Sequence, residues 1–345
     1  MEFLNFADQG AVREYEDFVE SRGGSYLQSA HWCGVKQNWR HEAVLSRDSQ
    51  GRLRATALVL VKKFPPPLRP FLYCPRGPVW DYENVAAFED LMEGLEELSR
   101  KYRAYYCKMD PQVEESEDKK VHTLRAAGLS FVPWRQDDLG IQCRSNYILE
   151  LQGRDQDQLL ASFKSKCRYN IRLAQRKGVV CGVYGKERLD EFMALMEETS
   201  RRDGFQMRSR AYFARMMDSL GDRCRLYLCH YQGEALSGAI CVRYGGRVSY
   251  VYGASASRRR ELMPNYLMQW EMIRWAEESG CGIYDFEGVP HWHDPSHPNY
   301  GVYQFKSGFN GRLAVYAGEF TQTFARRYKA AFDRVLKWVG YQKLL

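Results

Sequence analysis

Apolar residues in the first half of the chain change from a strand pattern to a helical one and back. Residues 55–61 form an apolar run, a proline-rich turn follows, and residues 71–73 form a second run, which is typical of two buried strands. Apolar positions then recur on one face of a helix, at Phe88, Leu91, Met92, Leu95 and Leu98. Residues 104–109 again resemble a strand, which ends before Asp110 and Pro111. The pattern predicts a hairpin, a helix and a strand.

The second half of the chain repeats this order. Residues 238–244 and 247–252 flank Gly245-Gly246, a pair that favours a tight hairpin turn. A helical stripe follows at Leu267, Trp270, Ile273 and Trp275. Residues 283–286 then form a strand-like run. Hairpin, helix and strand is the core order of the acetyltransferase-like (GNAT) α/β fold, although the same order is also common in unrelated proteins.

A chain of 345 residues is too long for one ordinary core. We therefore expect an α/β (α+β) fold with a tandem pair of GNAT-like domains, at residues 1–149 and 150–320. The last segment, residues 321–345, has apolar side chains four residues apart, at Phe324, Tyr328, Phe332 and Leu336. This spacing predicts a C-terminal helix that packs back on the first domain.

Composition narrows the class of protein. Hydrophobic residues make up 45% and charged residues 27%, which is ordinary for a globular protein. No apolar run approaches the roughly 20 residues of a membrane helix, and the acidic N-terminus does not resemble a signal peptide, so we expect a cytoplasmic protein. The 10 cysteines include no Cys-x-x-Cys pair, which favours reduced thiols over disulfides or zinc. The net charge of +7 permits a polyanionic partner.

A basic stripe opens the second half. Its members fall every fourth residue and share one helix face: Lys164, Arg168, Arg172 and Arg176. No Asp or Glu lies between Leu159 and Lys186. Solvated helix faces normally mix charges of both signs, so the stripe is either an unusual surface face or a contact for RNA phosphates.

Several segments resemble the FemABX family of peptidoglycan-bridge aminoacyltransferases, and they are spread over nearly the whole chain. The segments are SYLQSAHW (residues 25–32), KCRYNIRLAQRKGV (166–179), YVYGAS (250–255), YDFEGVP (284–290) and GVYQFKSGFNG (301–311). The chain has no long heptad-patterned insertion, so it resembles the compact members that lack a coiled-coil arm.

The resemblance implies transfer of an amino acid from aminoacyl-tRNA, without a cofactor, to a stem-peptide amine. The acceptor would be a peptidoglycan precursor, either UDP-MurNAc-pentapeptide or lipid II. The basic stripe would then contact tRNA, and the basic C-terminal helix allows a peripheral contact with the inner membrane face. The sequence leaves the oligomeric state open, with a monomer as the simplest expectation.

The resemblance also implies catalytic residues. Acyl transfer passes through an oxyanion, which a fixed cation stabilises, and the family's essential lysine corresponds to Lys306, with Phe305 packing beside it. A second candidate comes from its position and not from the resemblance. Asp110 ends a predicted strand, a usual place for chemistry in α/β folds, where it would accept a proton from the attacking amine or orient that amine. The alternative readings are a surface lysine after a strand and a turn aspartate before Pro111.

Acceptor binding is implied for a second group of residues. The family holds the diphosphate of the nucleotide-linked sugar with a lysine and an arginine, which correspond to Lys36 and Arg208. Tyr212 lies one helical turn beyond Arg208, and Tyr252 matches a further acceptor-binding position. Ordinary surface cations and a core aromatic are the alternatives.

Other functions remain possible from the sequence. His291, His293 and His297 lie in a proline-containing loop without helical or strand spacing, so we predict no metal site. A CoA-dependent N-acyltransferase would cradle a pyrophosphate on glycines, but residues 257–264 contain none. A tRNA-dependent transferase acting on a lipid or protein acceptor, and a non-catalytic binding protein, are the remaining alternatives.

Overall fold

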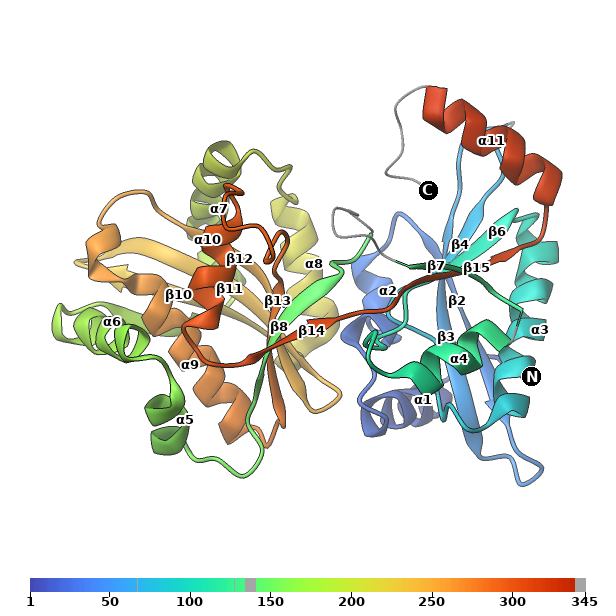
Figure 1. The fold of residues 1–345 in the computed structure, drawn as a ribbon, viewed down its shortest axis with the longest axis horizontal. Coiled ribbons are helices and arrows are strands. Elements are labelled where there is room, and N and C mark those ends of the chain that lie inside the picture. The colour runs from blue at the N-terminus through green and yellow to red at the C-terminus, as the bar shows by residue number, and fades with distance from the viewer. Residues whose placement is uncertain (67, 127, 134–140, 339–345) are drawn as a thin grey trace. The chain divides into compact units, whose positions relative to one another are not determined.

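The computed structural model describes residues 1–66, 68–126, 128–133 and 141–338 (Figure 1). Its internal contacts divide the chain into two compact units, each built on one mixed β-sheet. Unit 1 comprises Met1–Arg144 and Val315–Leu345, and unit 2 is the continuous segment Ser145–Ala314. The tandem α/β architecture is therefore confirmed, while the domain limits near residues 149 and 320 stay a prediction.

The sheet of unit 1 has the strand order β1-β2-β3-β4-β6-β15-β7, and β5 pairs with β3. Most helices and strands of unit 1 come from the N-terminal part of the chain, and the last two elements come from the C-terminal part. They are β1 (Glu2–Phe3), α1 (Gln9–Ser21), η1 (Tyr26–Gln28), α2 (Trp32–Val35), β2 (Arg40–Arg47), β3 (Leu53–Lys62), β4 (Phe71–Cys74), β5 (Val79–Trp80), α3 (Val85–Tyr102), β6 (Tyr106–Met109), α4 (Asp118–Ala126), β7 (Ser130–Pro133), β15 (Gly318–Thr323) and α11 (Arg326–Trp338).

The core of unit 1 lies between α3 and the sheet. Asn84 caps the N-terminus of α3 by accepting a hydrogen bond from the backbone N–H of Ala87. In the predicted apolar stripe of α3, Met92 is partly buried and the other four residues are buried, and the stripe packs against the inward-facing residues of β2 and β3. Gly94 allows close approach, because a Cβ atom there would lie 2.3 Å from a methyl group of Val44 on β2.

The sheet of unit 2 has the order β14-β8-β13-β12-β11-β10-β9. Its elements are β8 (Ser145–Glu150), α5 (Gln156–Ser162), α6 (Ser165–Arg176), β9 (Val180–Tyr184), η2 (Lys186–Arg188), α7 (Leu189–Asp203), α8 (Arg210–Leu220), η3 (Gly221–Arg223), β10 (Cys224–Tyr231), β11 (Glu234–Tyr244), β12 (Arg247–Ser255), η4 (Arg260–Leu262), α9 (Pro264–Glu278), β13 (Ile283–Gly288), α10 (Tyr300–Ser307) and β14 (Arg312–Val315).

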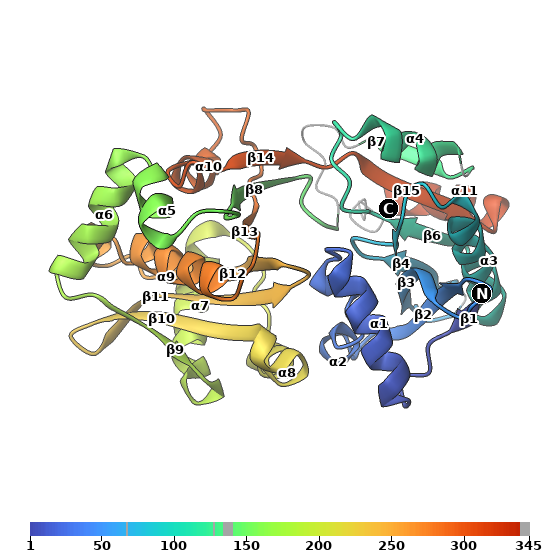
Figure 2. The same ribbon diagram turned by 90° about the horizontal axis from the view of Figure 1, so that it is seen from below.

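Helices cover both faces of the second sheet. Alternate residues of β10 and β11, such as Tyr227 and Cys241, face the buried side of α9. Helices α7 and α8 lie on the other face (Figure 2). The intervening residues of the two strands face these helices, and Gly238 lies against Phe192 and Leu195 of α7. The turn between β11 and β12 has left-handed glycines at Gly245 and Gly246, as the sequence predicted.

In each unit a helix connects two strands that run parallel. In unit 1, β4 runs parallel to β6, and α3 joins them; in unit 2, β12 runs parallel to β13, and α9 joins them. The β12–β13 pairing covers only Arg247–Ile283, Val248–Tyr284 and Ser249–Asp285. Beyond this point β12 continues without β13, so the two strands part near the carboxyl end of β13.

The prediction of a helix from residue 321 is wrong at its start. Residues 318–323 form β15, which pairs with β6 on one side and β7 on the other, and α11 begins only at Arg326. Tyr328 and Phe332 of α11 pack on Tyr105, with ring centroids 5.1 and 5.4 Å apart. The helix thus packs on unit 1, as predicted. Among the helices in the described ranges, none combines the length and apolar character that crossing a bilayer requires.

Candidate active site

Lys306 is buried at the carboxyl end of β13 in the second sheet. It lies on α10 and is only 6% exposed. Its Nζ donates hydrogen bonds to the backbone oxygens of Gly288, at 2.7 Å, and Glu287, at 3.3 Å. The ring of Tyr250, on β12, lies 5.9 Å from the same nitrogen. The alternative reading of a surface lysine after a strand is therefore wrong, and the ammonium is fixed where β12 and β13 part.

A polar network holds the two carbonyl groups that face Lys306. Glu287 has a left-handed φ of 59°, a conformation that costs a non-glycine residue about 1–3 kcal/mol. Asp285 compensates for this cost, because its Oδ1 accepts the backbone N–H of Glu287 at 2.8 Å. Arg247 pairs with Asp285 Oδ2 at 2.7 Å, and Asn146 Nδ2 donates to both oxygens of Asp285, at 3.2 and 3.1 Å. The network therefore fixes the backbone that orients the lysine.

Asp285 has a role that the sequence did not predict, although the residue lies within a motif of the family resemblance. The available signal was an acidic residue between Tyr284 and Phe286, two apolar residues of β13, where it is 1% exposed. A buried carboxylate of this kind needs both a counter-charge and hydrogen-bond donors. Sequence spacing did not identify these partners, because Asn146 and Arg247 lie on two other strands.

The helix of Lys306 is joined to the basic helix α6. The N–H of Lys164 donates to the oxygen of Gly308 at 3.0 Å, directly after the end of α10. Phe163 and Phe309 pack edge to face, with centroids 5.2 Å apart. Phe305 packs on Tyr266 of α9 at 4.9 Å. The basic stripe therefore begins beside the segment that follows the candidate catalytic lysine.

The stripe itself is mostly exposed. Lys164, Arg172 and Arg176 are exposed, and no ion pair holds any stripe residue within the described part of the chain. Arg168 differs from the others, because its guanidinium donates to the backbone oxygens of Ala161, at 3.0 Å, and Phe163. It therefore satisfies carbonyl groups at the end of α5 as well as contributing charge. Tyr169, 56% exposed, lies beside Arg176 on the same helix.

Three predicted acceptor-binding residues lie together in unit 2. The guanidinium of Arg208 is exposed and lies 5.5 Å from the ring centroid of Tyr212. The hydroxyl of Tyr252 donates to the hydroxyl of Tyr212 at 3.1 Å. Burial raises the pKa of Tyr212, and the neighbouring Tyr252 adds to that rise. Tyr252 is also packed against Phe213, so it has a structural contact in addition to its predicted role.

The two predicted residues of unit 1 have different surroundings. Lys36 ends α2, is half-buried, and has its Nζ 5.6 Å from the ring of Trp32. Asp110 is fully buried, and its oxygens accept the hydroxyl of Tyr73 at 2.6 Å and the N–H of Arg76 at 2.7 Å. Burial raises the pKa of Asp110 to about 6, against the lowering effect of the Arg76 charge. Its role as a base stays a prediction.

The histidine loop has a compact arrangement. The rings of His291 and His297 stack with centroids 3.6 Å apart, and His293 lies 6.5 Å from His291. Within the residues that the structure describes, no group of three His, Cys, Asp or Glu side chains is placed to hold a metal ion.

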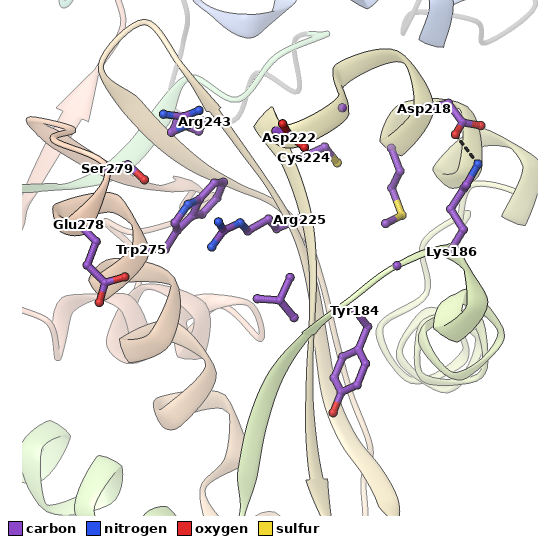
Figure 3. A pocket seen from close by; sticks show the side chains of 14 residues that line it. Tyr184, Lys186, Asp218, Asp222, Cys224, Arg225, Arg243, Trp275, Glu278 and Ser279 are labelled. Atoms are coloured by element: carbon purple, nitrogen blue, oxygen red, sulfur yellow. Dashed lines mark hydrogen bonds and ion pairs between the residues drawn. The ribbon is translucent and has the colours of Figure 1, made fainter.

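A cavity of about 730 Å³ lies at another part of unit 2 (Figure 3). Its lining includes residues from the start of β10 and from the ends of β11 and α9. These lie at the opposite end of the sheet from the carboxyl end of β13, and therefore from Lys306. The guanidinium of Arg225 stacks over Trp275 at 4.3 Å, and Lys186 pairs with Asp218. None of the predicted site residues lines this cavity.

The sequence of the chain matches a known protein family. The model of the FemAB family matches residues 11–234 and 230–333. A "Lipid II:glycine glycyltransferase" of Staphylococcus aureus (strain MRSA252) is 28% identical over 396 residues, covering 93% of this chain and 92% of the relative. Because that alignment is longer than the 345 residues of this chain, the relative has inserted residues that this chain lacks.

Solved structures agree with this assignment. The crystal structure of FemX has a TM-score of 0.88 and 25% identity, covering 96% of this chain and all of that one (100%). A tandem GNAT protein from the clavulanic acid biosynthesis pathway has a TM-score of 0.54 and 11% identity, and it supports the fold alone. Since the family model matches nearly the whole length and the fold agrees, the chain belongs to the FemAB family.

Proposed function

We propose that this protein transfers an amino acid from aminoacyl-tRNA to a stem-peptide amine of a peptidoglycan precursor. The observation that supports this most is Lys306, a buried cation held by two backbone carbonyls at 2.7 and 3.3 Å. Membership of the FemAB family and a relative named as a lipid II:glycine glycyltransferase supply the reaction class.

The reaction requires little from the protein beyond positioning and one charge. The acceptor amine attacks the ester carbonyl of the aminoacyl-tRNA, and a C–N bond forms. The C–O bond to the ribose then breaks, and the amine loses one proton while the ribose oxygen gains one. Negative charge develops on the carbonyl oxygen in between, and the Lys306 ammonium stabilises it there. Because the ester is already activated, no covalent enzyme intermediate is needed.

The basic stripe is the proposed contact for the tRNA donor. It begins at Lys164, which is bonded to Gly308 two residues after Lys306, so RNA held along α6 brings its acyl end towards the lysine. Exposed Tyr169 offers a ring on which an unpaired base can stack. The phosphate contacts would make donor binding strongly dependent on salt.

Lys36 and Arg208 are the proposed contacts for the acceptor diphosphate, with Tyr212 and Tyr252 beside Arg208. A diphosphate occurs in both UDP-MurNAc-pentapeptide and lipid II. The name of the relative favours the lipid-linked acceptor. We assign the reaction to the cytoplasm, where charged tRNA is present.

The CoA-dependent alternative has no support. In the turn before α9, the N–H of Ser257 donates to Glu198 Oε1 at 2.6 Å. Arg258 is paired with Glu198 at 3.1 Å and with Glu234 at 2.5 Å. A CoA pyrophosphate bound at this turn would have to displace the Glu198 carboxylate from the backbone N–H of Ser257.

A transfer assay with the product read by mass tests the proposal. Charged tRNA should support transfer to lipid II or UDP-MurNAc-pentapeptide, ribonuclease should abolish it, and acyl-CoA should have no effect. Consumption of acyl-CoA at a comparable rate in ribonuclease-treated protein would replace the proposal with the acetyltransferase reading.

The donor surface has its own test. Arg172→Glu with Arg176→Glu should raise KM for charged tRNA and flatten its salt dependence, by a little under one unit of slope per lost contact on the duplex estimate. These residues are preferred to Arg168, which also bonds α5. Arg201→Glu on α7, an exposed residue that pairs with Glu197 at 2.9 Å, is the control. An unchanged KM in the double variant would remove α6 from the donor site.

A further inference from the structure

A second basic surface lies in unit 1, and it includes none of the residues assigned above. It combines the β3–β4 loop, the end of α3 and the outer face of α11 (Figure 1). We call it the unit 1 basic surface. Its cations are Lys63, Arg69, Arg103, Arg326, Arg327 and Arg334, of which all but the half-buried Arg69 are exposed.

Direct contacts join the three segments. The N–H of Arg69 donates to the hydroxyl of Tyr328 on α11 at 2.9 Å, and its Nε donates to the oxygen of Arg103 at 3.1 Å. Lys63 Nζ lies 5.7 Å from the ring of Tyr102, the last residue of α3. Phe64 and Phe332 have ring centroids 6.4 Å apart. The cations therefore belong to one continuous surface.

Acidic side chains do little to neutralise this surface. Residues 53–80 contain no Asp or Glu. Asp333 on α11 is paired with Lys329 at 2.7 Å, and Glu42 is paired with Lys101 at 2.6 Å. Glu96 and Glu97 lie on α3 more than one turn before Arg103. The six named cations thus leave an excess of positive charge, whereas an ordinary solvated face mixes signs.

Apolar side chains are exposed among these cations. Leu68, in the β3–β4 loop, is 39% exposed, and Val335, on α11, is 54% exposed. The apolar face of α11 is already used, because Tyr328 and Phe332 pack on Tyr105. Leu68 and Val335 therefore lie on the solvent-exposed side of the loop and of α11.

We propose that the unit 1 basic surface binds an anionic phospholipid bilayer. Each lysine or arginine near such a bilayer contributes about a fivefold increase in binding, and exposed apolar side chains enter the boundary between headgroups and acyl chains. RNA fits this surface less well, because single-stranded RNA is usually bound by stacking its bases on exposed aromatic rings. The aromatic rings of this surface, Tyr102, Tyr328 and Phe332, are half-buried or buried. Membrane binding itself does not depend on the proposed function. Only its consequence rests on that function, namely that a lipid-linked acceptor lies in the same bilayer as the bound protein.

Vesicle co-sedimentation of the full-length protein is the direct test, and it needs no turnover. The protein should bind phosphatidylcholine vesicles that contain phosphatidylglycerol, bind pure phosphatidylcholine vesicles weakly, and lose binding in high salt. Arg327→Gln with Arg334→Gln should lower binding by roughly 25-fold. The control is Lys119→Gln with Arg125→Gln on α4, two exposed cations outside this surface. Equal binding to both vesicle types, or an equal loss in the control, would overturn the proposal.

Turnover separates this proposal from the function. The Arg327→Gln/Arg334→Gln variant should match the wild type with soluble UDP-MurNAc-pentapeptide and lose activity with lipid II in anionic vesicles. A raised KM for tRNA in this variant would identify an RNA surface and refute membrane binding. A wild-type protein that binds anionic vesicles but transfers nothing from tRNA would refute the proposed function and leave membrane binding intact.

Discussion

Replacing Lys306 by Met tests the catalytic assignment most directly. Met has a similar length and no charge, so the change removes the cation with little change in packed volume. Removal of one group that stabilises an oxyanion typically lowers kcat by about 10²–10³, which corresponds to roughly 3–4 kcal/mol. We expect a loss in this range, with KM for both substrates changed much less, because the contact acts in the transition state.

The surroundings of Lys306 predict a separate effect on stability. The variant loses hydrogen bonds of 2.7 and 3.3 Å to the oxygens of Gly288 and Glu287. A buried acceptor left without its donor costs about 1–3 kcal/mol. Unfolding of the variant should therefore shift to lower denaturant while remaining cooperative, and circular dichroism should be unchanged under assay conditions.

A second variant separates charge from geometry. Lys306→Arg keeps the cation but places a larger planar group in a position that is 6% exposed. We expect its kcat to lie between those of the wild type and Lys306→Met, in single-turnover transfer from charged tRNA with the product read by mass. A folded Lys306→Met protein with near-normal kcat would refute the oxyanion assignment.

Three further predictions concern the other residues of the site. Asp285→Asn should lower kcat and leave both KM values nearly unchanged. It should also cost about 3 kcal/mol of stability, because it breaks the buried ion pair that fixes the backbone facing Lys306. A variant with wild-type kcat would show that Asp285 does not position Lys306. Asp110→Asn should make the free energy of unfolding less dependent on pH. In the wild type the pKa of the buried Asp110 is raised to about 6, so ionising this carboxylate destabilises the fold as pH rises from about 4 to 6. The loss over this range is roughly 3 kcal/mol. Denaturation curves at the two ends of this range would check it, and an equal pH dependence in both proteins would contradict it. Lys36→Ala and Arg208→Ala should each raise KM for acceptors with the diphosphate and have little effect on an acceptor without it; equal sensitivity of both acceptors would contradict the phosphate assignment.

The sequence predicted the repeated hairpin, helix and strand because each is defined by short-range periodicity. It misplaced the start of the last helix because β15 is short and its partner β6 lies about 200 residues earlier in the chain. The spacing from Phe324 to Phe332 was helical, but nothing local in residues 318–323 identified their cross-strand neighbours.

The candidate site was predicted only in part for a similar reason. Helical spacing found the stripe on α6, but it did not show that Arg168 folds back on the carbonyls of α5. The resemblance pointed to Lys306, while its burial and its two carbonyl partners depend on the left-handed turn at Glu287. Asp285 was missed because its role comes from Arg247 and Asn146, which only the folded sheet brings to it.

The position of β15 has a consequence for how the protein is made. Unit 2 is one continuous segment, so it can fold as soon as residues 145–314 have left the ribosome. Unit 1 begins first but must wait, because β15 pairs with both β6 and β7. A nascent chain therefore has Lys306 and α6 in a finished unit while β6, the strand that leads to Asp110, still has an open edge. During synthesis that edge is a site where another chain can pair wrongly, until β15, which is translated after unit 2, closes it.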